Sequence, residues 1–375
     1  MDKACKVAIA AGGTAGHVNP ALALAEELRD RGCDVTFYGE TRRLEGKLVP
    51  EAGFDFCPVN VTGFDRSRPW TLVTALMHLS HEEKRLAALF RNDSDKKPDV
   101  AIGFGAYVEL PLVRAAKRVG IPYALHEQNS VPGLANKQSA KGAALIGIAQ
   151  PAVAEVFEGA GANSSAIKMV GNPVRSSVLA GNAARGRASL GIPAGAVMLL
   201  VFGGSLGAQH LNEELAALKS RLLAQDNLYI VHSTGADGYE ACASALALTE
   251  EEKKRYRLMP YIEDMGDMLA AADLVLSRAG ASSIAEIAAL AVPSVLVPYP
   301  FATADHQTTN ARYLVDAGAA VMFKDDAIGD EAFATTLANL LKDGSARARM
   351  AAAARGLAQD KAAERLADEL LALVK

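Results

Sequence analysis

The 375-residue chain has few cysteines, little tryptophan and no long apolar run. Its four cysteines, Cys5, Cys33, Cys57 and Cys242, form no CxxC pair and no metal-ligand spacing, so we expect free thiols in a reducing compartment and not a disulfide scaffold. The apolar run at residues 7–11 ends in glycines and is too short for a signal peptide. No segment reaches the ~18 apolar residues of a membrane-spanning helix, so any membrane contact is expected to be peripheral.

Neither sign of charge dominates. Lys and Arg number 39 and Asp and Glu number 43, a net charge of −4, whereas dedicated nucleic-acid-binding proteins are strongly basic. We therefore expect no nucleic-acid partner. Half of the residues are hydrophobic, and the length suggests about two domains, each with a sizeable core.

Short apolar runs alternate with longer amphipathic stretches along the whole chain. This alternation is typical of βαβ units, in which helices cover both faces of a parallel sheet. The predicted strands are residues 7–11, 35–38, 100–104, 123–126 and 145–149, then 197–202, 228–232, 274–276 and 294–297. The alanine-rich tail, residues 351–375, is predicted to be helical.

A glycine-rich turn occurs twice, about half the chain apart. Residues 12–16 read GGTAG and residues 203–207 read GGSLG, and each turn follows a predicted strand and precedes a predicted helix. Neither is a Walker A loop or the dinucleotide pattern GxGxxG, but either can bring backbone N–H groups close to an anion. The pair predicts two similar Rossmann-like domains, with a boundary near residues 171–175 (GNPVR).

Two polar residues in the first half invite a functional interpretation. His17 follows the first glycine turn and is a candidate general base, or a residue that only packs or caps its helix. Glu40 ends the second strand, where a dinucleotide-binding enzyme places its ribose-binding acid. The glycine spacing argues against that role, and a solvated acid at a strand end is the alternative.

Four more segments follow predicted strands and should lie at the carboxyl edge of a sheet, where ligands bind. They are residues 103–107 (GFGAY), 126–129 (HEQN), 277–286 (SRAGASSIAE) and 305–307 (DHQ). The third segment begins a helix with small residues, which suits a diphosphate, and Glu286 could accept two ribose hydroxyls. For residues 126–129 a hydrogen-bonded loop network is the alternative, and for Glu286 a solvated helix acid.

We expect no metal site. The one DxD match, at residues 93–95, lies in a polar connection before Pro98 and is interpreted as a solvated turn, and no cluster has the spacing of metal ligands. His78 and His81 lack a third ligand.

Several ordered motifs between residues 12 and 311 resemble those of one family, the undecaprenyldiphospho-muramoylpentapeptide β-N-acetylglucosaminyltransferases (MurG). The motifs are GGTAGHVNPALALAEEL, GFGAYVELP, HEQNSVPGLANK, GNPVR, GGSLGA, SRAGASSIAEIAALAVPSVLVPYP and DHQTTNA. The resemblance implies an α/β GT-B fold, two Rossmann-like doubly wound parallel-sheet domains facing a cleft. It implies inverting transfer of GlcNAc from UDP-GlcNAc to the muramyl 4-hydroxyl of lipid I, giving lipid II and UDP, with no cofactor.

The resemblance also assigns domains. Residues 1–174 would bind lipid I and face the membrane, with a C-terminal helix at about residues 357–375 packing back on them. Residues 175–356 would bind UDP-GlcNAc.

The resemblance assigns the site residue by residue, with His17 as the catalytic histidine. The donor side would comprise Thr14, Ala15, Gly16, Asn129, Arg175, Ser205, Ile262, Ala281, Ser282, Glu286 and Gln307, and the acceptor side Gly105, Tyr107 and Asn129. The chain departs from the usual family pattern at Ala15, Ala106 and Leu206, where glycine, glycine and glutamine are common. A methyl group at Ala15 requires a negative φ.

Because the acceptor carries a long lipid, the first domain should touch a membrane. Residues 70–79 are mostly apolar and are flanked by Arg66, Arg68, Lys84 and Arg85, a pattern that suits an interfacial helix; a core-facing helix is the alternative. The expected location is peripheral, on the cytoplasmic side of the bacterial inner membrane, together with other cell-wall synthesis proteins.

Three other interpretations stay open at this point. The chain could be another GT-B enzyme, such as a glycolipid galactosyltransferase or a UDP-GlcNAc 2-epimerase. It could also be a non-catalytic nucleotide-sugar-binding module, or a dinucleotide oxidoreductase. The presence of both halves and of His17 argues against the module.

Overall fold

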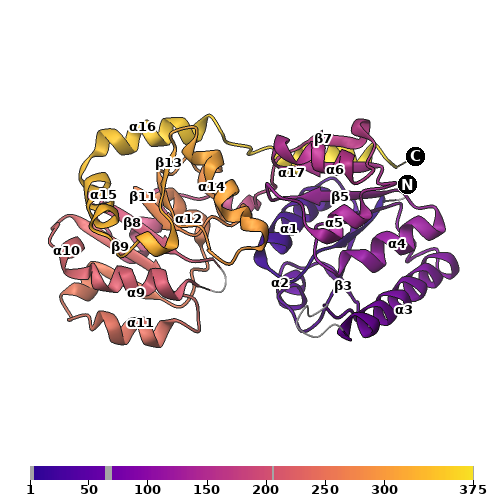
Figure 1. Cartoon of the computed structure of the whole chain (residues 1–375), viewed down its shortest axis with the longest axis horizontal. Helices are drawn as coiled ribbons and strands as arrows, with labels where there is room; N and C mark the ends of the chain where they lie inside the picture. Colours follow the sequence, from indigo (N-terminus) through magenta and orange to yellow (C-terminus); the bar gives the residue numbers. More distant parts are fainter. Residues whose placement is uncertain (1–3, 64–69, 205–206, 375) are drawn as a thin grey trace. The chain divides into compact units, whose positions relative to one another are not determined.

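The computed structural model describes residues 4–63, 70–204 and 207–374 (Figure 1). The chain forms two compact units, Met1–Arg175 with Asp360–Lys375, and Ser176–Gln359. The units therefore divide one residue later than the sequence suggested, so Arg175 belongs to the first unit. The C-terminal segment of that unit begins at Asp360 instead of residue 357.

The first unit is built on a seven-stranded parallel sheet in the order β3-β2-β1-β4-β5-β6-β7. The strands are β1 (Lys6–Ala10), β2 (Asp34–Gly39), β3 (Asp55–Pro58), β4 (Val100–Gly103), β5 (Tyr123–Glu127), β6 (Leu145–Ile148) and β7 (Ile167–Met169). The order reverses at β1, so the crevice outside the carboxyl ends of β1 and β4 is the position where doubly wound sheets bind ligands.

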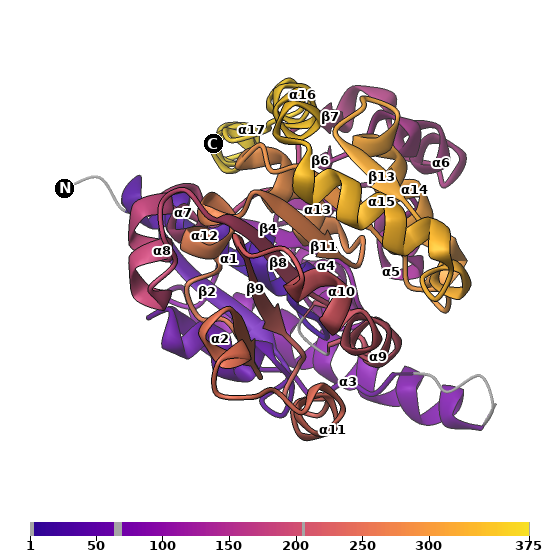
Figure 2. The same ribbon diagram turned by 90° about the vertical axis from the view of Figure 1, so that its left-hand side faces the viewer.

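Helices cover both faces of this sheet (Figures 1 and 2). One face carries α3 (Thr71–Asn92), α4 (Glu109–Val119) and α6 (Ala154–Gly159), and α5 (Leu134–Ser139) packs against α4. The other carries α1 (Ala15–Asp30), α2 (Glu45–Glu51) and α17 (Ala362–Leu371). Each face has its own buried cluster, so the sheet is buried on both sides, as its continuous apolar strands predict.

The C-terminal helix α17 completes the second face. Leu366, Ala367 and Leu370 are fully buried in the cluster that contains α1. Leu366 packs over Gly147 of β6, where an added Cβ would lie 3.0 Å from Leu366 Cδ1. The predicted helical tail is interrupted: α16 (Gly344–Arg355) belongs to the second unit, and residues 356–361 lead from it to α17.

The second unit has a six-stranded parallel sheet in the order β10-β9-β8-β11-β12-β13. Its strands are β8 (Val197–Phe202), β9 (Leu228–Ser233), β10 (Tyr256–Met259), β11 (Leu274–Ser277), β12 (Ser294–Leu296) and β13 (Ala320–Met322). Its other helices are α7 (Ser176–Leu179), α8 (Ala183–Leu190), α9 (Gln209–Ala217), α10 (Lys219–Leu223), α11 (Tyr239–Leu246), α12 (Met265–Ala271), α13 (Ala281–Ala289), α14 (His306–Val315) and α15 (Glu331–Lys342).

The second sheet repeats the strand order of the first, which has one further edge strand, β7. The first strands of the two sheets, β1 and β8, hold the same central place, and each is followed by its glycine turn and then a helix, α1 or α9. The repeat and the α/β doubly wound fold predicted from the sequence are confirmed.

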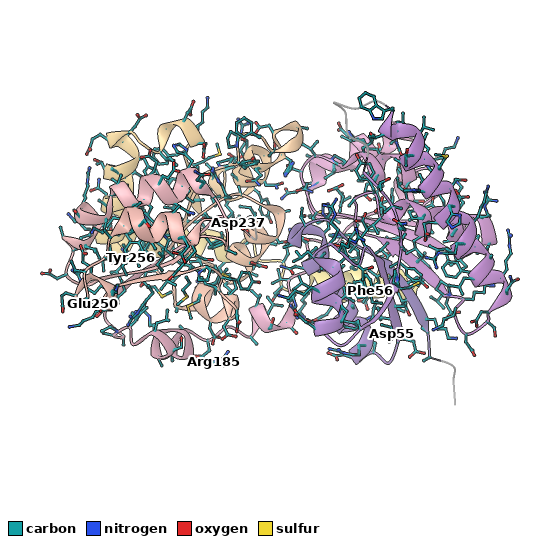
Figure 3. All side chains as sticks on the ribbon, turned by 90° about the horizontal axis from the view of Figure 1, so that it is seen from below. Asp55, Phe56, Arg185, Asp237, Glu250 and Tyr256 are labelled. Atoms are coloured by element: carbon teal, nitrogen blue, oxygen red, sulfur yellow. The ribbon has the colours of Figure 1, made fainter. Side chains whose placement is uncertain are left out.

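Four strands were not predicted, and all four are edge strands: β3 and β7 in the first sheet, β10 and β13 in the second. Asp55 and Phe56 of β3 and Tyr256 of β10 are labelled in Figure 3. Edge strands have a neighbour on one side only, so they need fewer apolar residues; Asp55 is exposed and Phe56 half-buried. In the described part of the chain, no helix is long and apolar enough to cross a bilayer.

Candidate active site

His17 lies in the first turn of α1, directly after the glycine turn that follows β1. Its Nδ1 lies 3.0 Å from the hydroxyl oxygen of Thr14, the residue before the helix. The other edge of the ring rests on Gly105, where an added Cβ would lie 3.0 Å from His17 Cδ2 and 3.2 Å from Nε2. The imidazole is therefore held between two loops at the carboxyl edge of the sheet.

Three loops meet at this edge. The first is the glycine turn, the second is residues 104–107 after β4, and the third begins at Gln128 after β5. Tyr107, in the second loop, is 45% exposed. Its ring approaches Gly63, where an added Cβ would lie 3.5 Å from Tyr107 Cε2.

Each of these loops is bonded to a buried glutamate. Glu45 Oε2 accepts the Gly13 N–H at 3.0 Å, and Glu109 Oε2 accepts the Gly105 N–H at 2.6 Å. Glu127 accepts the N–H groups of Asn129 and Gly133, both at 3.0 Å. The three side chains have at most 1% of their surface exposed. They satisfy backbone donors that secondary structure leaves unpaired.

Burial also shifts the pKa values of Glu109 and Glu127. It raises the pKa of Glu109 to about 8, and the nearby charge of Glu127 adds to the rise. Burial raises the pKa of Glu127 as well, while hydrogen bonds from Asn136, Asn129 and Gly133 oppose the rise. Because the Glu109 pKa in the fold lies above its usual value near 4.5, its contribution to stability is complete below pH 4.5 and is lost as pH rises through 8.

The HEQN segment is mostly integrated into the fold. His126 Nε2 donates to the Gly171 carbonyl at 2.9 Å, and burial lowers the His126 pKa to about 4, so the ring is neutral at pH 7. The Gln128 amide donates to the Phe104 carbonyl at 2.7 Å. The alternative of a hydrogen-bonded network therefore describes these two residues. Asn129 is half-buried and donates its side-chain amide to Glu127.

The second unit offers helix α13 at the carboxyl edge of its sheet. Gly280 precedes the helix in an extended conformation, and Ala281 and Ser282 form its first turn. The Ser282 hydroxyl is buried and has no hydrogen-bond partner within the described chain. Glu286 is half-buried in the second turn. Ser205 and Leu206, in the second glycine turn, lie outside the described residues.

Gln307 connects two loops of the second unit. Its Oε1 accepts the N–H of Ala279 at 3.1 Å and the N–H of Tyr299 at 3.0 Å. The amide of the DHQ segment therefore lies just beyond the ends of β11 and β12. Ile262, expected to contact the donor base through its backbone, is 5% exposed.

Arg175 lies in the first unit and pairs with Glu26 of α1. Its Nε and Nη2 lie 3.1 and 3.0 Å from Glu26 Oε1. Any anion that Arg175 binds must therefore compete with this carboxylate.

Three functional candidates, Glu45, Glu109 and Arg278, were given no role from the sequence, although Arg278 lies in the candidate segment at residues 277–286. Arg278, 6% exposed, donates to the Val297 carbonyl and pairs with Asp325 Oδ1 at 2.5 Å. For two of them the sequence held a signal, a charged residue next to an apolar segment. Glu109 begins the helix ELPLVRAA, and Arg278 directly follows β11.

No group of three or more metal-ligating side chains gathers among the residues with described positions. In the DxD segment, Asp93 Oδ1 accepts the N–H groups of Asp95 and Lys96 and so closes a local turn.

The two alanines that replace the usual glycines have different conformations. Ala15 begins α1 and does not have a positive φ, so its methyl group fits. Ala106 has φ 66°, in the left-handed region that is unfavourable for a residue with a Cβ.

We expect Ala106→Gly to raise the free energy of unfolding by about 1 kcal/mol, because it relieves the left-handed strain. Ala15→Gly is the matched control and should lower it by about 0.5–1 kcal/mol, because glycine is a poorer helix former. Urea denaturation followed by circular dichroism measures both. A shift of the two variants in the same direction would contradict the assigned backbone conformations.

The comparisons with known proteins agree with this architecture. The glycosyltransferase family 28 N-terminal domain matches residues 7–148, and the family 28 C-terminal domain matches residues 198–369.

Two curated relatives are named UDP-N-acetylglucosamine–N-acetylmuramyl-(pentapeptide) pyrophosphoryl-undecaprenol N-acetylglucosamine transferase. The one from Halothermothrix orenii is 37% identical over 92% of this chain and 93% of its own length. The one from Salinibacter ruber is 38% identical over 99% of this chain and 97% of its own length. The crystal structure of Acinetobacter baumannii MurG superposes with a TM-score of 0.72 at 29% identity, covering 98% of this chain and 99% of that one. The chain belongs to glycosyltransferase family 28 and, within it, to the MurG family of N-acetylglucosamine transferases.

Proposed function

We propose that this chain transfers N-acetylglucosamine from UDP-GlcNAc to the muramyl 4-hydroxyl of undecaprenyl-diphospho-muramoyl-pentapeptide, lipid I. The products are lipid II, for peptidoglycan synthesis, and UDP. The near full-length relatives that carry this activity in their names support the substrates. The geometric observation that carries the chemistry is His17, held by Thr14 and Gly105 at the carboxyl edge of the first sheet.

His17 acts as the general base of a single displacement. When its Nδ1–H donates to the Thr14 hydroxyl, Nε2 carries the lone pair that accepts a proton. The acceptor oxygen attacks the anomeric carbon as the bond to UDP breaks, the hydroxyl proton passes to His17, and UDP leaves with the electron pair. One displacement inverts the anomeric configuration. Tyr107, Gly105 and Asn129 then lie on the acceptor side.

The second unit binds the donor. The N-terminus of α13 offers backbone N–H groups and a positive dipole end to the diphosphate, and the Ser282 hydroxyl adds a donor with no partner in the described chain. Glu286, one turn further on, accepts the ribose hydroxyls. Gln307 contacts the sugar through its amide nitrogen, because its oxygen already accepts two backbone N–H groups.

The charge of the leaving UDP is stabilised by the protein without a metal ion. Helix N-termini and a guanidinium are the groups that perform this role when no cation is bound. Arg175 supplies the guanidinium and exchanges its Glu26 carboxylate for the diphosphate.

The first unit lies against the cytoplasmic face of the inner membrane. Five apolar side chains at the start of α3 are exposed: Trp70, Leu72, Val73, Leu76 and Met77. Lys84, Arg85 and Arg91 follow on the same helix; Arg66 and Arg68 lie outside the described residues. An exposed apolar patch on a helix that also carries cations suits an anionic lipid surface, and the membrane-anchored acceptor gives a reason for the contact. There the enzyme would meet other cell-wall synthesis proteins.

We expect His17→Ala to lower the turnover number by about 10²–10⁴-fold and to leave UDP affinity nearly unchanged. The assay follows UDP release from UDP-GlcNAc with a soluble lipid I analogue in EDTA, and His81→Ala, an exposed histidine of the same unit, is the control. An equal loss of turnover and UDP affinity would make His17 a binding residue. Conversion of UDP-GlcNAc by the wild type without acceptor would indicate an epimerase instead.

Glu286→Ala should raise the KM for UDP-GlcNAc by about tenfold, the value of a hydrogen bond to a charged group, with a smaller effect on the turnover number. Glu240→Ala, at an exposed glutamate of α11, should change neither constant. An unchanged KM for UDP-GlcNAc in Glu286→Ala would contradict the proposed contact of Glu286 with the ribose.

Val73→Glu should reduce sedimentation of the protein with vesicles that contain anionic phospholipid, because it places a carboxylate in the α3 patch. Val73 is 61% exposed, so the fold should tolerate the change. Val156→Glu, at an exposed valine of α6, should sediment like the wild type. Equal sedimentation of both variants would exclude the α3 patch as the contact.

A further inference from the structure

Of the three glutamates bonded to the loops around His17, Glu109 bonds to the loop against which the imidazole rests. We propose that Glu109 is a positioning residue: its carboxyl group fixes Gly105, and Gly105 fixes the His17 ring in the orientation that accepts the acceptor proton. This inference rests on the proposed role of His17 as the base.

The position of the Glu109 carboxyl group is determined by its surroundings. Glu109 begins α4 and has no exposed surface, and its Oε2 lies 2.6 Å from the Gly105 nitrogen. The carboxyl group occupies the space that Gly103 leaves open, because an added Cβ there would lie 2.5 Å from the same oxygen. Removing the side chain leaves the Gly105 N–H without its buried partner.

Gly105 transmits this constraint to the histidine. Its φ of 89° is accessible to glycine, and the absent side chain lets the ring approach to within contact of the backbone. Thr14 holds the Nδ1 edge of the ring through a hydrogen bond, and Gly105 lies against the Cδ2 and Nε2 edge. Movement of residues 104–106 would therefore change a contact that positions the edge that carries the proton-accepting nitrogen.

The protonation of Glu109 indicates which substitution should preserve this role. Burial raises its pKa to about 8, so the carboxyl group is mainly neutral at pH 7 and accepts the Gly105 N–H through one oxygen. A glutamine amide can accept the same hydrogen bond from the same place. An aspartate keeps the carboxyl chemistry but is one methylene shorter and cannot reach Gly105 without moving the helix.

The test compares Glu109→Gln, Glu109→Asp and Glu109→Ala in the UDP-release assay with the soluble acceptor. We expect Glu109→Asp and Glu109→Ala to lower the turnover number by about 10–100-fold, the effect of a small misplacement of a reacting group, at an unchanged KM for UDP-GlcNAc. Glu109→Gln should remain within about threefold of the wild type. Glu82→Gln, at a buried glutamate of α3 bonded to Arg85, is the control and should not change turnover.

A double-mutant cycle with His17→Ala separates positioning from general loss of structure. If Glu109 acts through His17, Glu109→Asp should reduce the residual turnover of His17→Ala by less than about twofold, because the two residues then act as a unit. An equal fold-loss in both backgrounds, or Glu109→Asp more active than Glu109→Gln, would overturn the proposal.

The ¹⁵N chemical shifts of His17 give a readout that does not require turnover. They should match the wild type in Glu109→Gln and move in Glu109→Asp, and unchanged shifts in Glu109→Asp would also overturn the proposal. If His17→Ala keeps full turnover, the assignment of the base fails. If His17 is essential and Glu109→Asp behaves like the wild type, only the positioning role fails.

Discussion

The first unit depends on one constraint: backbone N–H groups in the loops beyond the strands have no partner in the sheet and must find other acceptors. Parallel strands end at the same edge, so the three loops that follow β1, β4 and β5 meet there without a ladder to pair them. Glu45, Glu109 and Glu127 provide those acceptors. Burying three carboxyl groups is unfavourable by itself, and the raised pKa values of Glu109 and Glu127 record that penalty. The result is a set of hydrogen bonds that hold the loops around His17.

The second unit repeats the strand order of the first but holds its loops with different chemistry. Gln307 accepts two backbone N–H groups, and the buried Arg278 donates to the carbonyls of Val297 and Pro298. The charge of Arg278 is balanced by Asp325, whose other oxygen lies 2.9 Å from His210 Nδ1. A buried guanidinium and a helix N-terminus favour an anion, as the proposed binding of a diphosphate by the second unit requires.

Sequence periodicity predicted the interior strands well because burial on both faces demands continuous apolar runs. The runs at residues 7–11 and 197–202 correspond to β1 and β8, which are central in their sheets. The edge strands β3, β7, β10 and β13 do not require a continuous apolar run, and they were not predicted. Alanine propensity predicted a helical tail but cannot show that α16 and α17 pack in different units; the return of the last helix to the first unit was expected only from the family resemblance.

The sequence by itself determined the tandem α/β fold, the two glycine turns, the family resemblance and the choice of His17 as the candidate base, because these depend on local patterns in the chain. Only the tertiary structure decided what holds His17 in place. Glu45 accepts the N–H of Gly13, 32 residues away, and Glu109 accepts the N–H of Gly105, 4 residues away. Neither spacing is a recognisable motif. The structure likewise placed Arg175 beside Glu26, 149 residues away. Such contacts depend on which strand ends meet at one sheet edge, and that is set by the order of the strands in the sheet.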